Sequence, residues 1–258
     1  MIEKINRKIR IILLSLLSRM PFWVKKHNCN ICGNEICDFV EGGSNSAFFL
    51  NRHVIGGGTR DKYLCPVCGA LDRTRWCYYV LRKNTRIFTE PCLVLHFAPE
   101  KPLVNLIKKN KCCEYYTADI NPKVAEYQVD ITDIQFENSM FDYILVNHVL
   151  EHISDEHKAI QELKRVLKAD GKMIVSFPIC TDMEETFEDD SVKTPGERLE
   201  KFGQEDHVRL YGLDAKERLE RYGLSVKQLS PKDILSVDEI ERLGLIPDDI
   251  MFVCEKQH

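Results

Sequence analysis

The 258-residue chain has no glycine between positions 70 and 170, no apolar run long enough to cross a bilayer and no strong excess of either charge. A membrane-spanning helix needs about 20 apolar residues, whereas the apolar run at residues 11–17 is bracketed by Arg10 and Arg19. That segment has the charge pattern of a secretory signal, but no Ala-x-Ala cleavage site follows it. A hydrophobic fraction of 44% and a charged fraction of 29% exclude a disordered or fibrous chain. We therefore expect a globular protein.

Cysteine is abundant, but its distribution does not indicate disulfide bonds. The chain has eleven cysteines, an odd number, and several of them, such as Cys92, Cys180 and Cys254, stand alone in apolar runs. Disulfide frameworks are typical of small exported domains with even numbers of cysteines. The sequence therefore predicts a reducing, cytoplasmic location, with membrane association as an additional option.

Charge is divided unevenly along the chain. Residues 1–90 carry 15 Lys and Arg against 7 Asp and Glu, and the remainder carries 21 against 33. A basic N-terminal third favours contact with a phosphate, a lipid headgroup or RNA, and a solvated basic surface is the alternative. Residues 1–27 predict a basic, apolar helix. This segment, residues 1–26 in particular, can lie in an anionic membrane interface or dock on the protein's own core.

Residues 28–72 predict a small zinc-ribbon module that precedes a main domain at residues 73–258. The module has two Cys-x-x-Cys knuckles, a spacing that aims two sulfurs at one tetrahedral Zn²⁺. A glycine, with its backbone freedom, follows each knuckle. The predicted zinc ligands are Cys29, Cys32, Cys65 and Cys68, and Cys37 is a spare thiol that is an alternative to Cys32. Four sulfur ligands leave no open coordination position, so the expected role of the metal is structural.

From residue 92 onward, short apolar segments alternate with helical patterns. This alternation predicts an α/β fold with a parallel sheet and crossover helices. Helices are expected at residues 73–83 and 154–168, the second with a Ser154 N-cap and an end at Asp170-Gly171. Seven strands are expected, at residues 93–97, 115–120, 127–131, 141–147, 172–177, 224–229 and 250–254.

Acidic residues stand where two of these strands end. A doubly wound sheet binds its ligand outside the carboxyl ends of its strands. Asp119 ends the second strand and can accept hydrogen bonds from both ribose hydroxyls of a nucleoside, a solvated strand-end carboxylate being the alternative. Asp130 ends the third strand, where it can reach an adenine amino group, and Ile131 can pack on the ring.

Three segments resemble class I methyltransferases. They read Phe136-x-Asn138-Ser139-x-Phe141-Asp142-Tyr143-Ile144 after Asp130, then His148-Val149-Leu150-Glu151-His152, then Glu162-Leu163-x-Arg165-Val166-Leu167-Lys168-x-x-Gly171. The resemblance covers roughly residues 92–180. The chain is also similar to a bacterial group that pairs a Cys-x-x-Cys ribbon with His-Phe-Ala-Pro-Glu, here 96–100, and Phe-Gly-Gln-Glu-Asp-His-Val-Arg-Leu-Tyr-Gly, here 202–212. The resemblance implies a Rossmann-like, seven-stranded class I methyltransferase sheet and S-adenosylmethionine as cofactor.

The first turn of the sheet departs from the wider family, which has Gly-x-Gly where this chain has Ala98-Pro99. That turn is small and preorganised, and Glu100 can contact the methionine ammonium group. A relative that no longer binds the cofactor is the alternative. The predicted cofactor-binding residues are His96, Phe97, Ala98, Glu100, Asp119, Ile120, Asp130, Ile131 and Asn147.

Histidines follow the fourth strand and recur in the 202–212 segment. Because there is no Asn-Pro-Pro-Tyr motif after the fourth strand, O-methylation is favoured over methylation of a nucleobase amine. A hydroxyl acceptor benefits from a general base, and His148, His152 and His207 are the candidates, each of which can instead be a structural strand-end or cap residue. Arg209 and Tyr211 are the predicted substrate-binding residues, with Arg209 holding a phosphate or carboxylate.

The sequence thus predicts an S-adenosylmethionine-dependent methyltransferase that O-methylates a small molecule or a glycan, such as a lipid-linked sugar. Two alternatives stay open. One is a zinc-ribbon RNA methyltransferase, and the other is a non-catalytic binding module on the same fold. RNA is the less favoured partner, because basic and aromatic residues interleave poorly around the ribbon.

Overall fold

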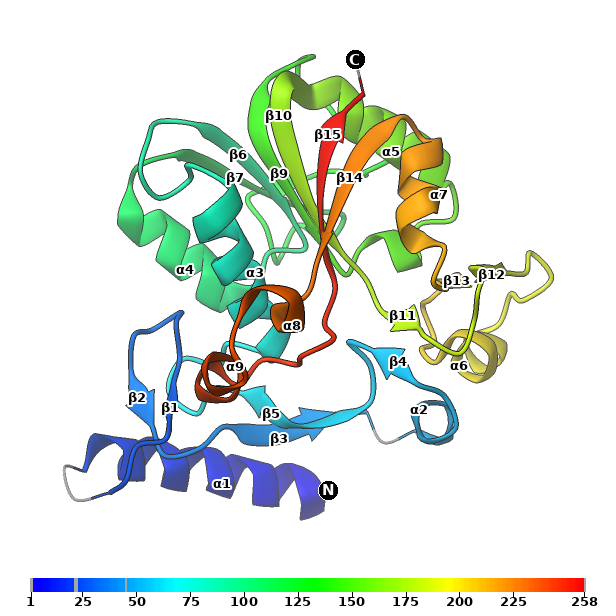
Figure 1. The fold of residues 1–258 in the computed structure, drawn as a ribbon. Coiled ribbons are helices and arrows are strands. Elements are labelled where there is room, and N and C mark those ends of the chain that lie inside the picture. The colour runs from blue at the N-terminus through cyan, green and yellow to red at the C-terminus, as the bar shows by residue number, and fades with distance from the viewer. Residues whose placement is uncertain (1, 21–22, 45, 258) are drawn as a thin grey trace.

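A mixed seven-stranded sheet forms the centre of the structure (Figure 1). The computed structural model describes residues 2–20, 23–44 and 46–257. The strands lie in the order β14–β15–β10–β9–β6–β7–β8, and β15 runs antiparallel to both of its neighbours. Their bounds are β6 (Leu93–Phe97), β7 (Glu114–Asp119), β8 (Tyr127–Gln128), β9 (Phe141–Asn147), β10 (Leu167–Ser176), β14 (Leu224–Leu229) and β15 (Met251–Lys256). The predicted seven-stranded α/β fold is confirmed.

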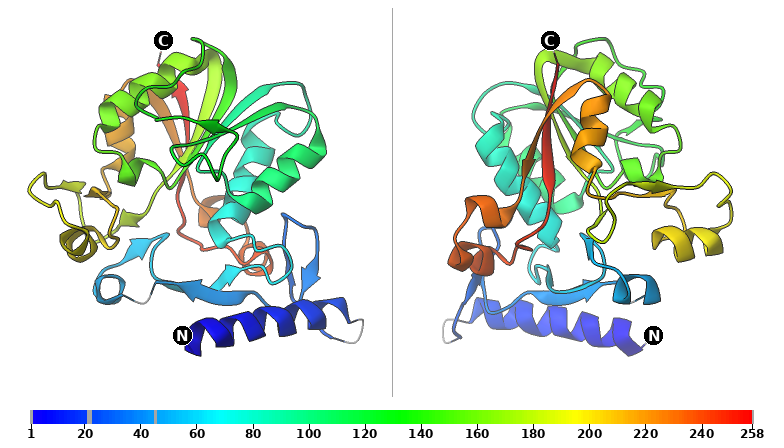
Figure 2. Two further views of the ribbon diagram at one scale, coloured as in Figure 1. Left: turned by 180° about the vertical axis from the view of Figure 1, so that it is seen from behind. Right: turned by 45° about the vertical axis from the view of Figure 1, so that its right-hand side comes forward.

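Helices cover both faces of the sheet (Figure 2). Side chains alternate along each strand, so on β6 Leu95 enters one apolar cluster and Val94 enters the other. The first face packs against α5 (Glu156–Val166) and α7 (Ala215–Arg221), and the second against α3 (Asp72–Asn84) and α4 (Lys101–Asn110). Burial of both faces explains why the central strands are almost continuously apolar.

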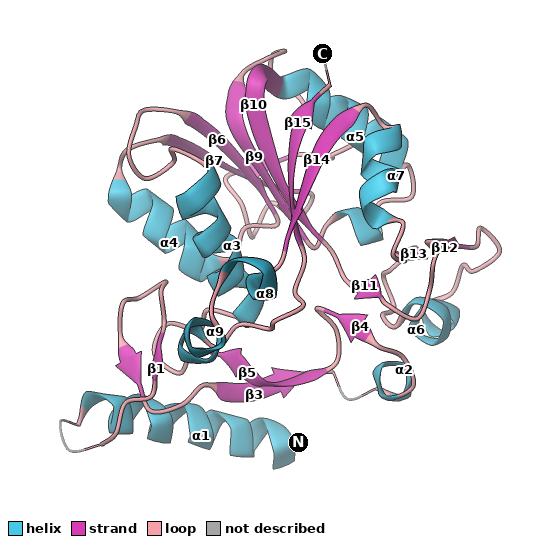
Figure 3. Cartoon of the chain, in the orientation of Figure 1, coloured by secondary structure: helices cyan, strands magenta, loops and turns pink. Residues whose placement is uncertain are grey.

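The described residues among 2–71, here called the N-terminal layer, lie beneath the carboxyl ends of the parallel strands (Figures 1 and 3). The layer consists of α1 (Ile2–Arg19), β1 (His27–Asn28), β2 (Glu35–Ile36), β3 (Val40–Gly43), α2 (Ala47–Leu50), β4 (Val54–Ile55) and β5 (Thr59–Leu64). Strand β4 pairs antiparallel with β11 (Ile179–Cys180), which follows β10 directly. The layer is therefore joined to the sheet through main-chain hydrogen bonds.

The remaining elements lie beside the sheet and the N-terminal layer. They are the 3₁₀-helix η1 (Leu150–His152), β12 (Phe187–Glu188), α6 (Pro195–Phe202), β13 (Arg209–Leu210), α8 (Pro231–Ile234) and α9 (Val237–Leu243). Within the described part of the chain, no helix has both the length and the apolar character needed to cross a membrane.

Arg75 on α3 connects the N-terminal layer to the C-terminal helices. Its side chain is fully buried and lies 3.9 Å from the ring centroid of Phe39. The guanidinium donates to the carbonyl oxygens of Lys62 and Ala70 in the layer and of Leu243 and Gly244 at the end of α9, at 2.5 to 2.9 Å. Each of these buried carbonyls needs a donor, so one side chain fixes the knuckle at Cys65, β5 and α9 together.

Three local predictions were wrong. The N-cap of α5 is Asp155, whose side chain accepts from Lys158 N at 2.9 Å, and not Ser154. The helix ends at Val166 because Leu167 already belongs to β10, so Asp170-Gly171 lies in that strand and does not close the helix. The third strand is also shorter than predicted, because Asp130 Oδ1 accepts from Thr132 N and turns the chain.

Replacing Arg75 with Met is expected to lower the free energy of unfolding by at least about 3 kcal/mol, because the substitution removes the buried guanidinium that donates to four carbonyls. Urea unfolding followed by circular dichroism measures this change. The matched control is Arg82→Met on the exposed side of the same helix, which is expected to change stability by less than about 0.5 kcal/mol. Equal effects of the two substitutions would contradict the role assigned to Arg75.

Candidate functional site

Four cysteine sulfurs converge in the N-terminal layer. The Sγ atoms of Cys29, Cys32, Cys65 and Cys68 all lie within 4.8 Å of one another, with 3.7 Å between Cys29 and Cys68 and 4.0 Å between Cys32 and Cys65. Sulfurs that share a tetrahedral Zn²⁺ at about 2.3 Å lie roughly 3.8 Å apart. The geometry of the predicted ligand set is therefore compatible with zinc.

The backbone of each knuckle supports this geometry. Gly33 N donates to Cys29 O at 2.8 Å, and Gly69 N donates to Cys65 O at 3.0 Å. Both glycines have a positive φ, 72° and 76°, a conformation that residues with a Cβ disfavour. Cys37, the alternative ligand, lies outside the cluster, and its backbone N donates to Ser18 Oγ at 3.3 Å.

The purified protein is expected to hold about one zinc ion per chain, measured by inductively coupled plasma mass spectrometry. Cys32→Ser is expected to lose most of this zinc because it leaves three thiolates, whereas Cys37→Ser keeps it. Zinc loss in Cys37→Ser with retention in Cys32→Ser would mean that the first knuckle uses the other thiol.

The first turn of the sheet adopts a conformation that glycine favours, although glycine is absent. Ala98 has a φ of 46°, and its N donates to Ala118 O at 3.0 Å. The left-handed conformation costs a residue with a Cβ about 1 to 2 kcal/mol. The chain therefore forms a tight turn at the predicted cofactor position.

Glu100 is held at the start of α4 by His96. The His96 ring is fully buried, with Nδ1 2.6 Å from Tyr115 Oη and Nε2 3.0 Å from Glu100 Oε2. Burial acts to raise the pKa of Glu100, but the hydrogen bond with His96 and the positive charge of Arg73 help to outweigh it, and the pKa lies below its ordinary value. Glu100 Oε1 is buried without a hydrogen-bond partner among the described residues. An anionic oxygen thus remains free for a cationic ligand.

The other predicted cofactor-binding residues differ in their solvent exposure. Asp119 ends β7 partly exposed, its Oδ1 accepts from Asn121 N at 2.8 Å, and Ile120 next to it is 69% exposed. Asp130 is exposed in the turn after β8. Phe97 and Ile131 are instead buried in the apolar core, so neither presents its side chain to a ligand in this conformation.

Asn147 ends β9 in the interior. Its Nδ2 donates to Cys77 Sγ at 3.2 Å, and its Oδ1 accepts from Ser176 Oγ at 3.2 Å. The fourth strand is thereby fixed against α3 and β10 at the point where the chain turns toward η1. The next residue, His148, has a φ of 54°.

The three predicted catalytic histidines gather after β9. His148 Nδ1 lies 3.2 Å from Glu151 Oε1, and the rings of His152 and His207 meet edge to face with centroids 4.7 Å apart. Burial, followed by the positive charge of Arg73, lowers the pKa of His148, and burial also lowers the pKa of His207. Both imidazoles are therefore neutral near pH 7, the form that accepts a proton.

Arg209 and Tyr211, the predicted substrate-binding residues, lie in the interior. The Arg209 guanidinium donates to Glu188 Oε1 and to the carbonyls of Leu150 and Ile153. The Tyr211 hydroxyl donates to Glu156, and its ring stacks on Phe177 with centroids 3.7 Å apart. In this conformation both side chains hold the 202–212 segment onto η1 and α5, and neither lines the cavity described next.

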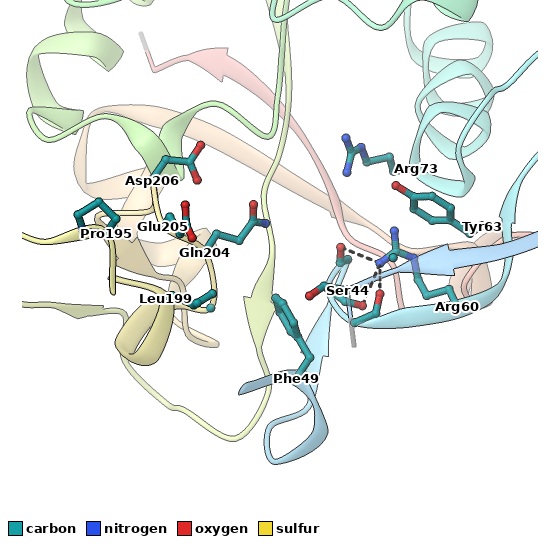
Figure 4. Close-up of a pocket in the computed structure, with 15 residues that line it drawn as sticks. Ser44, Phe49, Arg60, Tyr63, Arg73, Pro195, Leu199, Gln204, Glu205 and Asp206 are labelled. Carbon is teal, nitrogen blue, oxygen red and sulfur yellow. Dashed lines mark hydrogen bonds between the residues drawn. The ribbon is translucent and has the colours of Figure 1, made fainter. Parts of the chain in front are cut away.

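A cavity of about 850 Å³ lies between the N-terminal layer and the segment around α6 (Figure 4). Arg60, Tyr63 and Arg73 project from one wall, and Gln204, Glu205 and Asp206 lie on the other. The remaining lining residues are Gly43, Ser44, Phe49, Gly56, Gly57, Gly58, Pro195, Leu199 and Gly203. A Cβ at Gly56 would lie 3.5 Å from His148 Cε1, so the cavity reaches the end of β9.

Arg73 and Glu151 are site residues that the sequence reasoning missed. Arg73 is the second residue of α3, close after the second knuckle, and its Nε is buried without a hydrogen-bond partner among the described residues. Glu151 belongs to the segment at residues 148–152, in which only His148 and His152 were predicted as catalytic residues. Nothing in the sequence indicates that the ribbon folds over the strand ends, and that contact is what places Arg73 at the site.

Comparison with known proteins gives one family match. Residues 101–175 match the family model described as a methyltransferase domain. Among curated proteins, 45 residues are 46% identical to an uncharacterized protein of Methanocaldococcus jannaschii. That alignment covers 17% of this chain and 22% of the relative, so it spans less than a quarter of either protein.

Solved structures show a similar arrangement at low identity. YcgJ of Bacillus subtilis has a TM-score of 0.45 and 14% identity over 70% of this chain and all of its own. A Pyrococcus horikoshii protein has a TM-score of 0.45 and 16% identity over 71% of this chain and 92% of its own. A third structure is phosphoethanolamine N-methyltransferase 2 of Haemonchus contortus, solved with S-adenosylhomocysteine. It has a TM-score of 0.44 and 16% identity over 67% of this chain and 51% of its own. The methyltransferase-domain match thus covers residues 101–175, a segment that includes the central strands of the seven-stranded sheet.

Proposed function

We propose that the protein is an S-adenosylmethionine-dependent O-methyltransferase whose acceptor carries a negative charge and binds in the cavity between the N-terminal layer and α6. The observation that carries the proposal is the position of this cavity, which has Arg60 and Arg73 on one wall and whose Gly56 lies next to His148 at the end of β9. The methyltransferase match supports the reaction type.

The strand ends offer the donor groups that the cofactor requires. Asp119 would accept the ribose hydroxyls, the exposed Ile120 would cover the adenine, and Glu100 Oε1 would accept from the methionine ammonium group. Once bound, S-adenosylmethionine supplies an electrophilic methyl group. His148, neutral and partly buried, is suited to take the proton that an acceptor hydroxyl loses as its oxygen attacks.

The cavity walls favour a small anionic acceptor over RNA. Arg73 offers an unpaired Nε to a phosphate or carboxylate, but Glu205 and Asp206 on the opposite wall would repel a long polyanion. A sugar or glycan phosphate combines a hydroxyl with one localised charge, which suits both walls.

A membrane-bound acceptor is supported by the exposed face of α1. Ser18 is buried and Arg10 lies within 4 Å of Asp38 and Glu41, so one side of the helix contacts the N-terminal layer. The opposite side exposes about half or more of each of Ile5, Ile9, Ile12, Leu13 and Leu16. Basic residues Lys8, Arg19, Lys25 and Lys26 are also exposed. Such a face suits the interface of an anionic membrane, where a lipid-linked sugar is found.

Calorimetric titration of S-adenosylhomocysteine tests the cofactor site. The wild-type protein is expected to bind, and Asp119→Ala is expected to weaken binding by at least about tenfold because a buried or partly buried charged hydrogen bond is worth roughly 1.5 to 3 kcal/mol. Asp170→Ala, at an exposed position in β10, is the matched control and keeps wild-type affinity. Absence of binding by the wild type would point to the non-catalytic alternative.

Sedimentation with phosphatidylglycerol vesicles tests the membrane proposal. The wild-type protein is expected to sediment with these vesicles and to stay in solution with phosphatidylcholine alone. Replacing Ile9 and Ile12 with Glu removes two apolar contacts and adds like charge, so association should fall several-fold. Val237→Glu, at an 81% exposed position on α9, controls for added charge. Equal loss in this control would contradict a role for α1.

A further inference from the structure

A cluster of metal-ligating side chains lies beside the cavity, apart from the cysteine cluster. Glu151 and His152 come from η1, and His207 comes from the segment before β13. One ligand atom from each of these residues lies within 4.8 Å of the other two. Ligand atoms that share a cation at about 2.1 Å lie roughly 3 to 4 Å apart, so small side-chain rotations bring all three to bonding distance.

Two members of this cluster are buried without the partners that burial demands. Glu151 is 1% exposed and His207 is 2% exposed. Glu151 Oε2 and His207 Nε2 lack a hydrogen-bond partner among the described residues, and Glu151 Oε1 lies 3.2 Å from His148 Nδ1. An unpaired polar atom in the interior costs on the order of 1 to 3 kcal/mol, and an unpaired charge costs more. The atoms left unpaired are those that a cation would bind.

Neighbouring groups complete the surroundings. His148 Nδ1 lies 3.2 Å from Glu151 Oε1, and Asp206 Oδ2 lies 3.3 Å from His152 Nδ1. Asp206 also lines the cavity. Residues that contact metal ligands in this way orient them and tune their basicity.

We propose that Glu151, His152 and His207 form a binding site for one divalent transition-metal ion, such as Mn²⁺ or Fe²⁺. Two imidazoles and one carboxylate form a ligand set that these metals accept and that leaves coordination positions open. The cysteine cluster, with four soft thiolates and no open position, selects zinc, so the two sites differ in metal and in role.

Asp206, which contacts His152, lines the acceptor cavity, so the three ligands lie next to it. A cation there would bind the acceptor hydroxyl oxygen and favour its deprotonated form, with the proton released to solvent. This catalytic role rests on the proposed function. Metal binding itself does not, because it depends only on the three ligands.

Titration of MnCl₂ into the zinc-containing protein tests the site, with free Mn²⁺ measured by electron paramagnetic resonance. The wild type is expected to bind about one Mn²⁺ per chain, and Glu151→Gln and His207→Gln are expected to weaken binding by at least about tenfold. His157→Gln, an exposed histidine on α5, is the matched control. His152→Gln is a second ligand variant at a 31% exposed side chain, whose folding does not depend on filling the core.

Absence of Mn²⁺ binding by the wild type, or equal weakening in His157→Gln, would overturn the site. So would wild-type affinity in a folded His152→Gln or Glu151→Gln protein. The site and the proposed function fail separately, because Mn²⁺ binding is measured without cofactor or acceptor. Mn²⁺ binding without any S-adenosylhomocysteine binding would keep the site and reject the methyltransferase activity.

Discussion

The buried Arg75 guanidinium is the interaction on which the arrangement of the molecule depends. It hydrogen-bonds β5 and the second cysteine knuckle on one side and the end of α9 on the other. Four thiolates around Zn²⁺ carry a net charge of about −2, and Arg75 is the fully buried cation that lies near them. One side chain thus attaches the N-terminal layer and places a positive charge near the knuckle sulfurs.

This attachment holds the N-terminal layer against the strand ends, where the candidate site lies. Parallel sheets bind ligands at the carboxyl ends of their strands, and here the N-terminal layer lies directly beneath those ends (Figure 1). Pairing of β4 with β11 brings the residue 56–58 glycines to the end of β9. Arg60 then donates to the carbonyls of Gly56, Gly57 and Gly58 at 2.9 to 3.1 Å and fixes that loop as a wall of the cavity.

Local features of the fold could be predicted from the sequence, because they depend on short-range patterns. The strands at 93–97, 141–147 and 224–229 were predicted with their observed bounds, since apolar runs between turn residues carry that information. The knuckle cysteines converge as their spacing indicates. The end of α5 was missed because strand pairing with β9 at Leu167 overrides the helical pattern of the segment.

The site was less predictable because it depends on contacts between distant segments. Arg209 and Tyr211 were predicted to bind substrate, yet both side chains lie in the interior, where they donate to Glu188 and Glu156. No sequence feature distinguishes Arg73 from the other basic residues of the helix predicted at 73–83. Only the fold of the N-terminal layer places it at the cavity. Glu151 and His207 meet across more than fifty residues, a separation that no local pattern bridges.

The central claim is that the strand ends beneath the N-terminal layer bind the methyl donor next to the acceptor cavity. A crystal structure of the protein with S-adenosylhomocysteine tests this claim most directly. The account predicts density for the ribose at Asp119 and for the amino-acid end at Glu100, with the sulfur directed toward His148. Density elsewhere on the sheet, or a well-ordered apo site at saturating ligand, would contradict it.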